Sequence, residues 1–203
     1  MLAGPDNTSW GHRQYFVPTT WNPADKAAGI TLSNGDLTVS SSTGDQGVRG
    51  VYGLDIDAGE SAYAEFTLDT IGSAAIGIAL ATAPISGANP QGHADSWVLN
   101  FGSGFWENTG GDDTASGFSF SPGDIMQIAL KGTKLWWGRN GVWANSGDPA
   151  AGTNAAYGTL SGVFYPIYIQ SGGTAAAATG NFGQSAFTYT PPAGFTPGWG
   201  VVS

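Results

Sequence analysis

KLWWGRNGVWANSGDPAAG, residues 134–152, carries three tryptophans and an Asn-Gly pair among few charged side chains. Asn140-Gly141 favours a type I′ turn, because both residues tolerate the positive φ angles that this turn requires. Successive side chains of a strand point to opposite faces, so Trp136 and Trp137 are expected on opposite sides of a sheet. The segment therefore predicts a β-hairpin with at least one of these two tryptophans in a core and the other covering an outer face.

Alternating segments of the same kind run through the rest of the chain. Asn34-Gly35 separates two alternating runs in residues 29–39 and predicts a second hairpin with a two-residue turn. Residues 74–81, AAIGIALA, predict a central strand whose small side chains allow close packing above it. No helical stripe of useful length is present. With strands of ordinary length, the chain accommodates on the order of twelve, which predicts two packed sheets.

The composition excludes several classes of function. The chain has 203 residues with 33 glycines, and a net charge of −9 with only six Lys and Arg. Nucleic-acid binding needs a basic face and membrane-surface binding a polybasic segment, so neither nucleic acid nor membrane is an expected partner. There is no cysteine, and the two histidines are His12 and His93. Thiolate chemistry is therefore excluded, and no metal or cofactor is predicted.

The two ends of the chain differ from its middle. Residues 1–28 contain three prolines and no periodicity, and they predict an irregular N-terminal arm. Its aromatic residues indicate docking on the domain or on a neighbouring subunit, and they are Trp10, Tyr15, Phe16 and Trp21. The sandwich is expected to span residues 29–197, followed by a tail at 198–203. The N-terminus lacks the features of a signal peptide, and the apolar run 73–85 is too short to span a bilayer, so no membrane insertion is expected.

The order of the segments resembles a known family. Four segments in sequence are similar to the C-terminal half of SPRY-like domains encoded by tailed bacteriophages and prophages: GDIMQIALKGTKLWWGRNGVW (123–143), GDPAAGTN (147–154), FYPIYIQ (164–170) and GNFGQSAFTYTPPAGF (180–195). WNPADKAAGITLSNGDLTV (21–39) is similar to the opening of the same domains. The resemblance covers roughly residues 20–197.

This resemblance implies an all-β fold, a concanavalin-like jelly roll in which two antiparallel sheets form a sandwich. It also implies a non-catalytic recognition module that uses loops at one edge. In phages it implies a part of the virion, in a tail, a fibre or a capsid decoration. The family has no fixed catalytic residues, so none is carried over to this chain.

Two loops supply candidate ligand-binding residues. Residues 102–117 place aromatic rings among glycines and polar groups, which suits a sugar that stacks on a ring and is hydrogen-bonded at its edge. The candidates in this loop are Phe105, Trp106, Glu107, Asn108, Asp112 and Asp113. The turn-rich loop 82–97 adds His93 and Trp97. Trp143, just past the Asn-Gly turn, is expected to pack on the rim or to contact a ligand. The alternative for the first loop is a solvated hairpin with one anchoring tryptophan.

The sequence contains no complete catalytic motif. Asp55, Asp57 and Glu60 come closest to the paired carboxylates of concanavalin-like glucanases, but a predicted turn takes Glu60 off the shared strand face. No nucleophile-elbow motif accompanies the two histidines. A calcium site in the loop 102–117 lacks EF-hand spacing. The chain is therefore predicted not to be an enzyme.

Two functions from different classes follow. The first is an exposed virion protein of a tailed phage or phage-like particle that binds a host surface polysaccharide or receptor through its edge loops. The second is a decoration or assembly protein of capsid or tail that contacts only other virion proteins, including a copy of itself, through its aromatic arm. In either case the expected location is the virion, after synthesis in the host bacterial cytoplasm.

Overall fold

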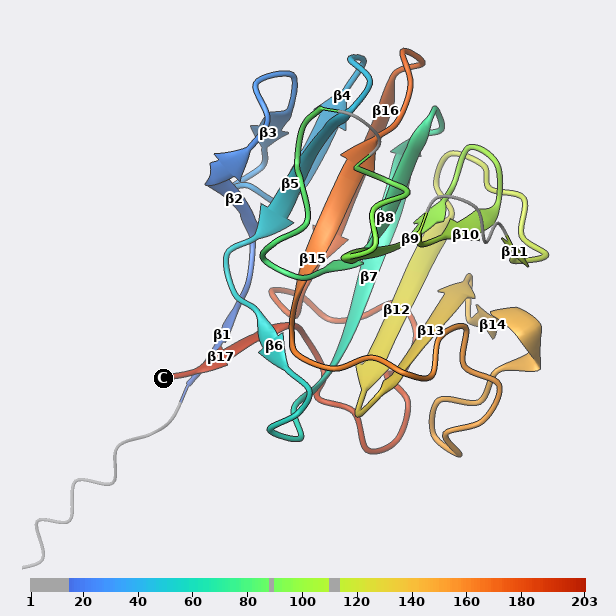
Figure 1. The fold of residues 1–203 in the computed structure, drawn as a ribbon. Helices are drawn as coiled ribbons and strands as arrows, with labels where there is room; N and C mark the ends of the chain where they lie inside the picture. Colours follow the sequence, from blue (N-terminus) through green and yellow to red (C-terminus); the bar gives the residue numbers. More distant parts are fainter. Residues whose placement is uncertain (1–14, 88–89, 110–113) are drawn as a thin grey trace, which may run out of the picture.

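Two antiparallel sheets pack face to face in the computed structural model, which describes residues 15–87, 90–109 and 114–203 (Figure 1). Within these residues the first sheet runs β11 (Thr114–Ala115), β10 (Phe105–Glu107), β9 (Ser96–Asn100), β8 (Ala74–Ala79), β15 (Val163–Gln170), β5 (Gln46–Gly50) and β2 (Trp21–Lys26), with β6 (Leu54–Asp55) also paired to β15. The second runs β14 (Val142–Trp143), β13 (Lys134–Arg139), β12 (Ile125–Lys131), β7 (Ser61–Thr70), β16 (Ala176–Asn181), β4 (Thr38–Ser41) and β3 (Thr31–Ser33). This architecture confirms the predicted all-β sandwich.

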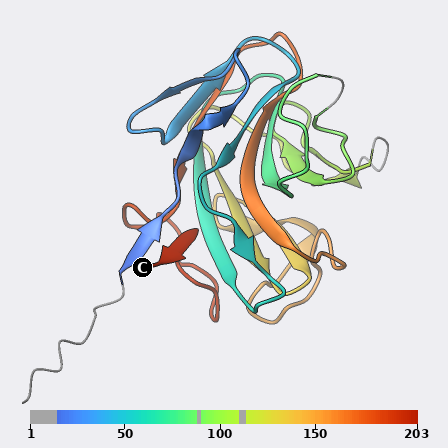
Figure 2. The same cartoon turned by 60° about the vertical axis from the view of Figure 1, so that its left-hand side comes forward.

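Within the described residues, three further elements lie outside the two packed sheets. β1 (Phe16–Pro18) and β17 (Gly200–Val202) pair with each other as a short ribbon beside the sandwich (Figure 2). A 3-10 turn, η1 (Ala144–Ser146), follows β14. No helix in the part of the chain that the structure describes is long and apolar enough to cross a membrane.

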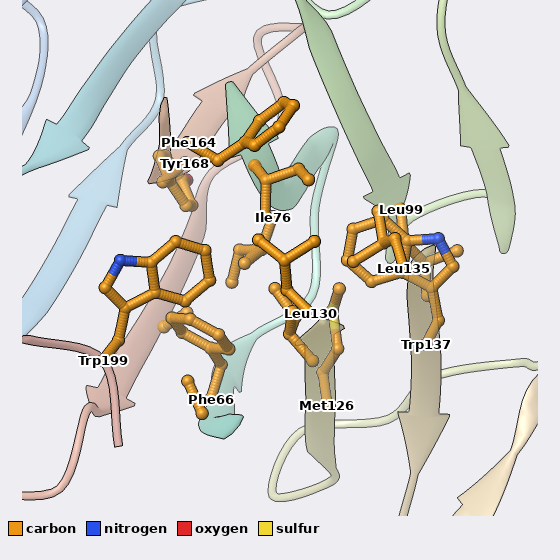
Figure 3. Packing of buried hydrophobic residues seen from close by; sticks show 14 of the residues in the cluster. Phe66, Ile76, Leu99, Met126, Leu130, Leu135, Trp137, Phe164, Tyr168 and Trp199 are labelled. Carbon is orange, nitrogen blue, oxygen red and sulfur yellow. The ribbon is translucent and has the colours of Figure 1, made fainter. Parts of the chain in front are cut away.

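The inner faces of the two sheets form the main core. Phe66, Met126 and Leu130 of the second sheet meet Ile76 and Leu99 of the first (Figure 3). All five side chains are fully buried. Burial of apolar surface on this scale is the main favourable term in folding, and it explains why alternating segments close into a sandwich.

The hairpin around Asn140-Gly141 forms as predicted. Asn140 and Gly141 have φ angles of 49° and 81°, which are both positive as a type I′ turn requires. Trp137 is buried in the main core. Trp136 is buried on the opposite face, where its ring lies edge-on to Phe195 and its Nε1–H donates to the carbonyl oxygen of Thr153 at 2.8 Å. One tryptophan thus stabilises each side of the second sheet.

Each sheet also has a covered outer face. On the first sheet, Ile167 and Ile169 pack beneath the loop 80–95, and the N–H of Gly47 donates to the carbonyl oxygen of Ile85 at 2.7 Å. On the second sheet, Tyr63, Ala129 and Trp136 pack beneath Phe187 and Phe195 of the C-terminal segment. Since both faces of the central strands are apolar and covered, β8 is buried along its whole length, as its small residues predicted.

A buried carboxylate holds the C-terminal segment on the second sheet. Glu65 is 3% exposed, and its oxygens accept the hydroxyl of Tyr63 at 2.8 Å and the N–H groups of Thr188 and Tyr189 at 2.9 and 2.8 Å. Gln127 donates its amide to the Tyr63 hydroxyl at 2.8 Å. Burial raises the pKa of Tyr63 far above its usual value, although the bond from Gln127 acts in the opposite direction. The Tyr63 hydroxyl therefore stays protonated, and both carboxylate oxygens of Glu65 accept hydrogen bonds.

The ends of the sandwich differ from the predicted boundaries. Trp21 was placed in an irregular arm, but it begins β2, pairs with Gly50 and is fully buried. Pro23 is tolerated there because β2 is an edge strand with an irregular register. Trp199, placed in the tail at 198–203, is likewise buried in the main core, and β17 follows it directly. Prolines at both ends obscured these short strands in the sequence.

The hairpin at Asn34-Gly35 is present, but its turn is longer than predicted. β3 and β4 pair up to Ser33 and Thr38, which leaves four residues in the loop. The indole N–H of Trp21 donates to the carbonyl oxygen of Leu37 at 3.1 Å, and its backbone N–H donates to that of Asp36 at 2.9 Å. These contacts with β2 hold the loop in its conformation. They join segments that are distant in sequence, so no local sequence pattern predicts them.

Candidate recognition surface

Three turns meet at one edge of the sandwich and enclose a shallow cleft of about 530 Å³. They join β7 to β8, β9 to β10 and β15 to β16, at the upper end of the molecule in Figure 1. The cleft is lined by Ile71, Gly72, Ser73, Asn100, Gly102, Ser103, Ser171, Gly172 and Thr174. No charged residue lines it, although the chain as a whole carries a net charge of −9.

Glycines allow the three turns to come this close. A Cβ on Gly72 would lie 2.1 Å from the carbonyl oxygen of Ala175, and a Cβ on Gly102 would lie 2.4 Å from that of Gly72. The N–H groups of Ser171 and Gly172 both donate to the carbonyl oxygen of Ser73, at 2.8 and 3.2 Å. Backbone therefore packs directly on backbone, which fixes the shape of the cleft.

The cleft presents hydrogen-bonding groups that are not used within the fold. Asn100 is 8% exposed, and its Oδ1 accepts the N–H groups of Gly102 and Ser103 at 2.8 and 3.0 Å. Its Nδ2 has no acceptor among the described residues. It is also not one of the fully buried side-chain atoms that lack a hydrogen bond, so it is accessible to a partner. The amide of Asn100 is thus held in one orientation with its donor free, which is an arrangement suited to binding.

Replacing Gly72 with alanine is expected to destabilise this edge. The added methyl group must push away the backbone carbonyl groups of Thr174 and Ala175 in the neighbouring turn. Overpacking of this kind lowers the free energy of unfolding by about 1–3 kcal/mol. Gly173→Ala is the matched control, because the nearest atom to its added Cβ is 4.0 Å away. Urea unfolding of both variants measures the difference. Equal stability of the two variants would contradict the packing described here.

The structure places Trp106 differently from the prediction. Trp106 is 7% exposed and belongs to the main core, so its ring offers no stacking surface for a sugar. Because β10 pairs with β9 and side chains alternate, the neighbouring Phe105 points outward and is 38% exposed. Glu107 is half-buried and pairs with Val98. The described part of the predicted loop contains β10 and β11 at the edge of the first sheet, which explains the burial of its tryptophan.

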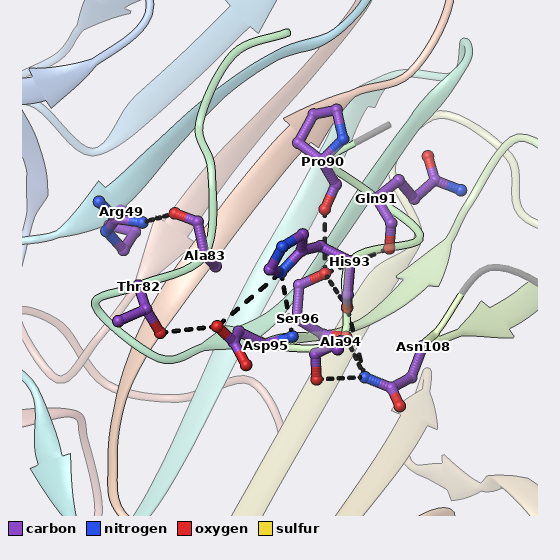
Figure 4. Close-up of polar contacts among 10 residues, drawn as sticks. All are labelled: Arg49, Thr82, Ala83, Pro90, Gln91, His93, Ala94, Asp95, Ser96 and Asn108. Carbon is purple, nitrogen blue, oxygen red and sulfur yellow. Dashed lines mark hydrogen bonds and ion pairs between the residues drawn. The ribbon is translucent and has the colours of Figure 1, made fainter. Parts of the chain in front are cut away.

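Asn108 serves the fold in a way that the sequence did not predict. Its Nδ2 donates to the carbonyl oxygens of Ala94 and Ser96 at 3.0 and 2.7 Å (Figure 4). It thereby fastens the second predicted loop, 82–97, to the end of β10. Both predicted ligand loops are consequently joined, but through a side chain that was expected to face a ligand.

His93 lies in this junction and does not form a catalytic pair. Its Nδ1 accepts the N–H of Asp95 at 3.2 Å and lies 3.9 Å from the carboxylate of the same residue. The nearby hydroxyl of Ser96 is fully buried and lies 2.9 to 3.2 Å from the carbonyl oxygens of Pro90, Gln91 and His93 (Figure 4). A nucleophile needs a base within reach of its proton and an exposed oxygen, and this serine has neither.

The remaining candidates are dispersed. Trp97 is half-buried, and its ring packs edge-on against Phe164 at 5.3 Å between centroids. Trp143 is half-buried and packs near Tyr63, at 6.4 Å, on the opposite sheet. Asp112, Asp113 and Trp10 lie outside the described residues. The described candidates therefore do not converge on one site, although Asn108 and His93 meet at one junction.

The acidic turn before β7 has a structural role. Asp55 Oδ1 accepts the N–H groups of Asp57 and Ala58, each at 3.1 Å, and Glu60 Oε2 accepts the N–H of Asp55 at 2.6 Å. These carboxylates shape their own turn rather than face each other across a substrate. No group of three metal-ligating side chains occurs in residues 15–87, 90–109 and 114–203.

The fold is of the SPRY-like class. The SPRY domain of human HERC1 superposes with a TM-score of 0.61 at 15% identity, covering 82% of this chain and 99% of that one. A human SPRY domain gives 0.58 at 15% identity, covering 78% and 98%, and the TRIM65 PSpry domain gives 0.56 at 12% identity, covering 81% and 92%. No protein-family model and no curated protein sequence matches the chain.

Proposed function

We propose that the chain is a non-catalytic recognition domain that binds its partner in the edge cleft between the three turns. The observation that carries this proposal is the free amide of Asn100, held in a cleft that also contains the hydroxyls of Ser73, Ser103 and Thr174. Convergent polar groups in a concave site with preset geometry are the usual basis of specific binding. The SPRY-like fold supports the same conclusion, because such domains generally bind other molecules through loops.

The biological setting proposed here is the surface of a tailed phage or phage-like particle. It is supported by the resemblance of five sequence segments, in order, to phage-encoded SPRY-like domains. In that setting the partner is a host surface polysaccharide or receptor. The uncharged cleft and the net charge of −9 favour a neutral partner over an acidic polymer, which the field of the protein would repel.

Blocking the cleft tests this proposal. Thr174→Arg places a long charged side chain in the cleft and is expected to weaken binding at least about tenfold, through steric exclusion and desolvation. Thr133→Arg is the control, because this exposed residue lies in the turn between β12 and β13 at the opposite end of the sandwich. The labelled chain is applied to intact bacterial strains and to purified neutral and acidic polysaccharides. Equal binding by both variants would contradict the assignment.

A second candidate function is assembly through the ends of the chain. It is favoured by the ribbon of β1 and β17, where Tyr15 is 63% exposed and Val202 is 62% exposed. Exposed apolar side chains on a protruding ribbon are typical of contacts between subunits. The two functions are compatible, because the ribbon and the cleft lie at opposite ends of β7, at Ser61 and Thr70.

A further inference from the structure

A second concave site lies beside the terminal ribbon. It measures about 430 Å³ and is more apolar than the edge cleft. The groove is lined by Phe16, Leu54, Gly59, Glu60, Ser61, Thr196, Gly200, Val201 and Val202. It therefore lies between the ribbon on one side and the acidic turn before β7 on the other.

The ribbon offers open backbone groups at its edges. Tyr15 and Ser203 exchange two backbone hydrogen bonds, at 3.0 and 2.9 Å, so they form a hydrogen-bonded pair. Hydrogen-bonded and non-bonded pairs alternate in antiparallel strands, which turns the N–H and C=O groups of Phe16 and Val202 outward. Neither ribbon strand has a second strand partner among the described residues. An edge of this kind accepts an added strand.

The groove also has an acidic rim, because Glu60 lines it and Asp55 and Asp57 belong to the same turn. Asp55, Asp57 and Glu60 form no ion pair within the described residues. Lys131, which pairs across the sheet with Ser61, donates its ammonium group to the carbonyl oxygen of Gly194 instead. An apolar groove with such a rim fits an extended segment that combines an apolar side chain with a cation.

The chain itself contains such a segment. Five of its six Lys and Arg lie in the described residues and donate to oxygens of their own fold, and they are Lys26, Arg49, Lys131, Lys134 and Arg139. The sixth is Arg13, which lies two residues before Tyr15 and three after Trp10. Residues 1–14 therefore supply both properties that the groove requires.

The direction of β1 determines which groove this segment reaches. β1 runs from the outer tip of the ribbon, where Tyr15 pairs with Ser203, toward the sandwich at Pro18. Residue 14 therefore joins the ribbon at its tip, where the side chains of Tyr15 and Val202 are 63% and 62% exposed and open to a second copy. A second copy facing the first has its groove within reach, since an extended chain covers about 3.4 Å per residue.

From these observations we infer that residues 1–14 of one copy occupy the ribbon groove of a second copy, with Arg13 beside Glu60 of that copy. The exchange is reciprocal, so one two-fold axis relates two identical contacts and the assembly closes as a dimer. This inference deepens the second proposed function, and the edge cleft plays no part in it.

Sedimentation equilibrium of the full chain tests the inference by charge reversal. The wild-type chain is expected to dimerise, and Arg13→Glu and Glu60→Arg are each expected to weaken the dimer at least about tenfold, which corresponds to 1.4 kcal/mol. The double variant restores the attraction with the charges exchanged and is expected to recover most of the affinity. Asp148→Arg makes the same charge change at an exposed site outside the groove and is expected to leave the dimer intact.

Each other outcome overturns the inference. A wild-type chain that stays monomeric at every concentration excludes the exchange between copies, as does a dimer that neither single variant weakens. A double variant no stronger than the single ones excludes the pairing of Arg13 with Glu60. Circular dichroism of each variant verifies that the fold is retained. Thr174→Arg should leave dimerisation unchanged, so failure here and failure of recognition by the cleft are separate results.

Discussion

Trp106→Ala is expected to lower the free energy of unfolding by about 3–5 kcal/mol, the usual loss when a buried aromatic side chain is removed from a core. Trp106 is 7% exposed and packs with the main core, while its strand β10 pairs with β9 opposite Leu99. The cavity lies near the edge of the first sheet, so the region from β9 to β11 should lose protection from hydrogen exchange first. Chemical denaturation and amide exchange measure both effects.

Phe105→Ala is the matched control for this prediction. Phe105 precedes Trp106 on the same strand, but it points outward and is 38% exposed. Its removal is expected to cost less than about 1 kcal/mol. If Trp106→Ala left stability unchanged while reducing ligand binding, Trp106 would be a binding residue and its burial in this structure would be wrong.

The sequence predicted the sandwich because the relevant signals are local. Alternation around Asn140-Gly141 placed Trp136 and Trp137 on opposite faces, and the structure confirms it. The small residues of β8 predicted a buried central strand for the same reason. Side chains alternate between the two faces of a strand as a direct consequence of strand geometry, so this pattern is independent of the rest of the fold.

The candidate site was harder to predict because it is formed by backbone. The aromatic and acidic residues of segment 102–117 predicted a ligand-binding loop, but Trp106 in this segment is buried. The cleft instead depends on Gly72 and Gly102, whose value lies in the close approach of segments remote in sequence. Glycine and serine are common in turns of every kind, so no sequence signal distinguishes these turns from others.

The outer layers were missed for a related reason. The loop 80–95 and the C-terminal segment contain turn formers and prolines, which indicate loops but not the face that a loop covers. Glu65 accepts N–H groups from residues more than 120 positions later in the chain. Its side chain lies on the same face of β7 as Tyr63, and only the tertiary structure shows that this face is covered.

Glu65→Ala is expected to destabilise the protein by about 3–5 kcal/mol. The substitution removes the acceptor for the Tyr63 hydroxyl and for the N–H groups of Thr188 and Tyr189, and each buried donor left unsatisfied costs about 1–3 kcal/mol. Glu65→Gln keeps one acceptor oxygen but turns an amide donor toward a backbone N–H, so its loss of stability should be smaller than that of the alanine variant. Denaturant titration at neutral pH ranks the two variants.

The same substitution distinguishes a local role from a global one. If Glu65 fastens the C-terminal segment, the amides of Thr188 and Tyr189 should exchange much faster in Glu65→Ala, because this cover opens before the sandwich does. Glu60→Ala removes a glutamate that is exposed and accepts a single N–H, so a loss below about 1 kcal/mol is expected. Unchanged exchange at both amides, or equal losses from the two alanine variants, would show that the carboxylate does not hold this segment on the sheet.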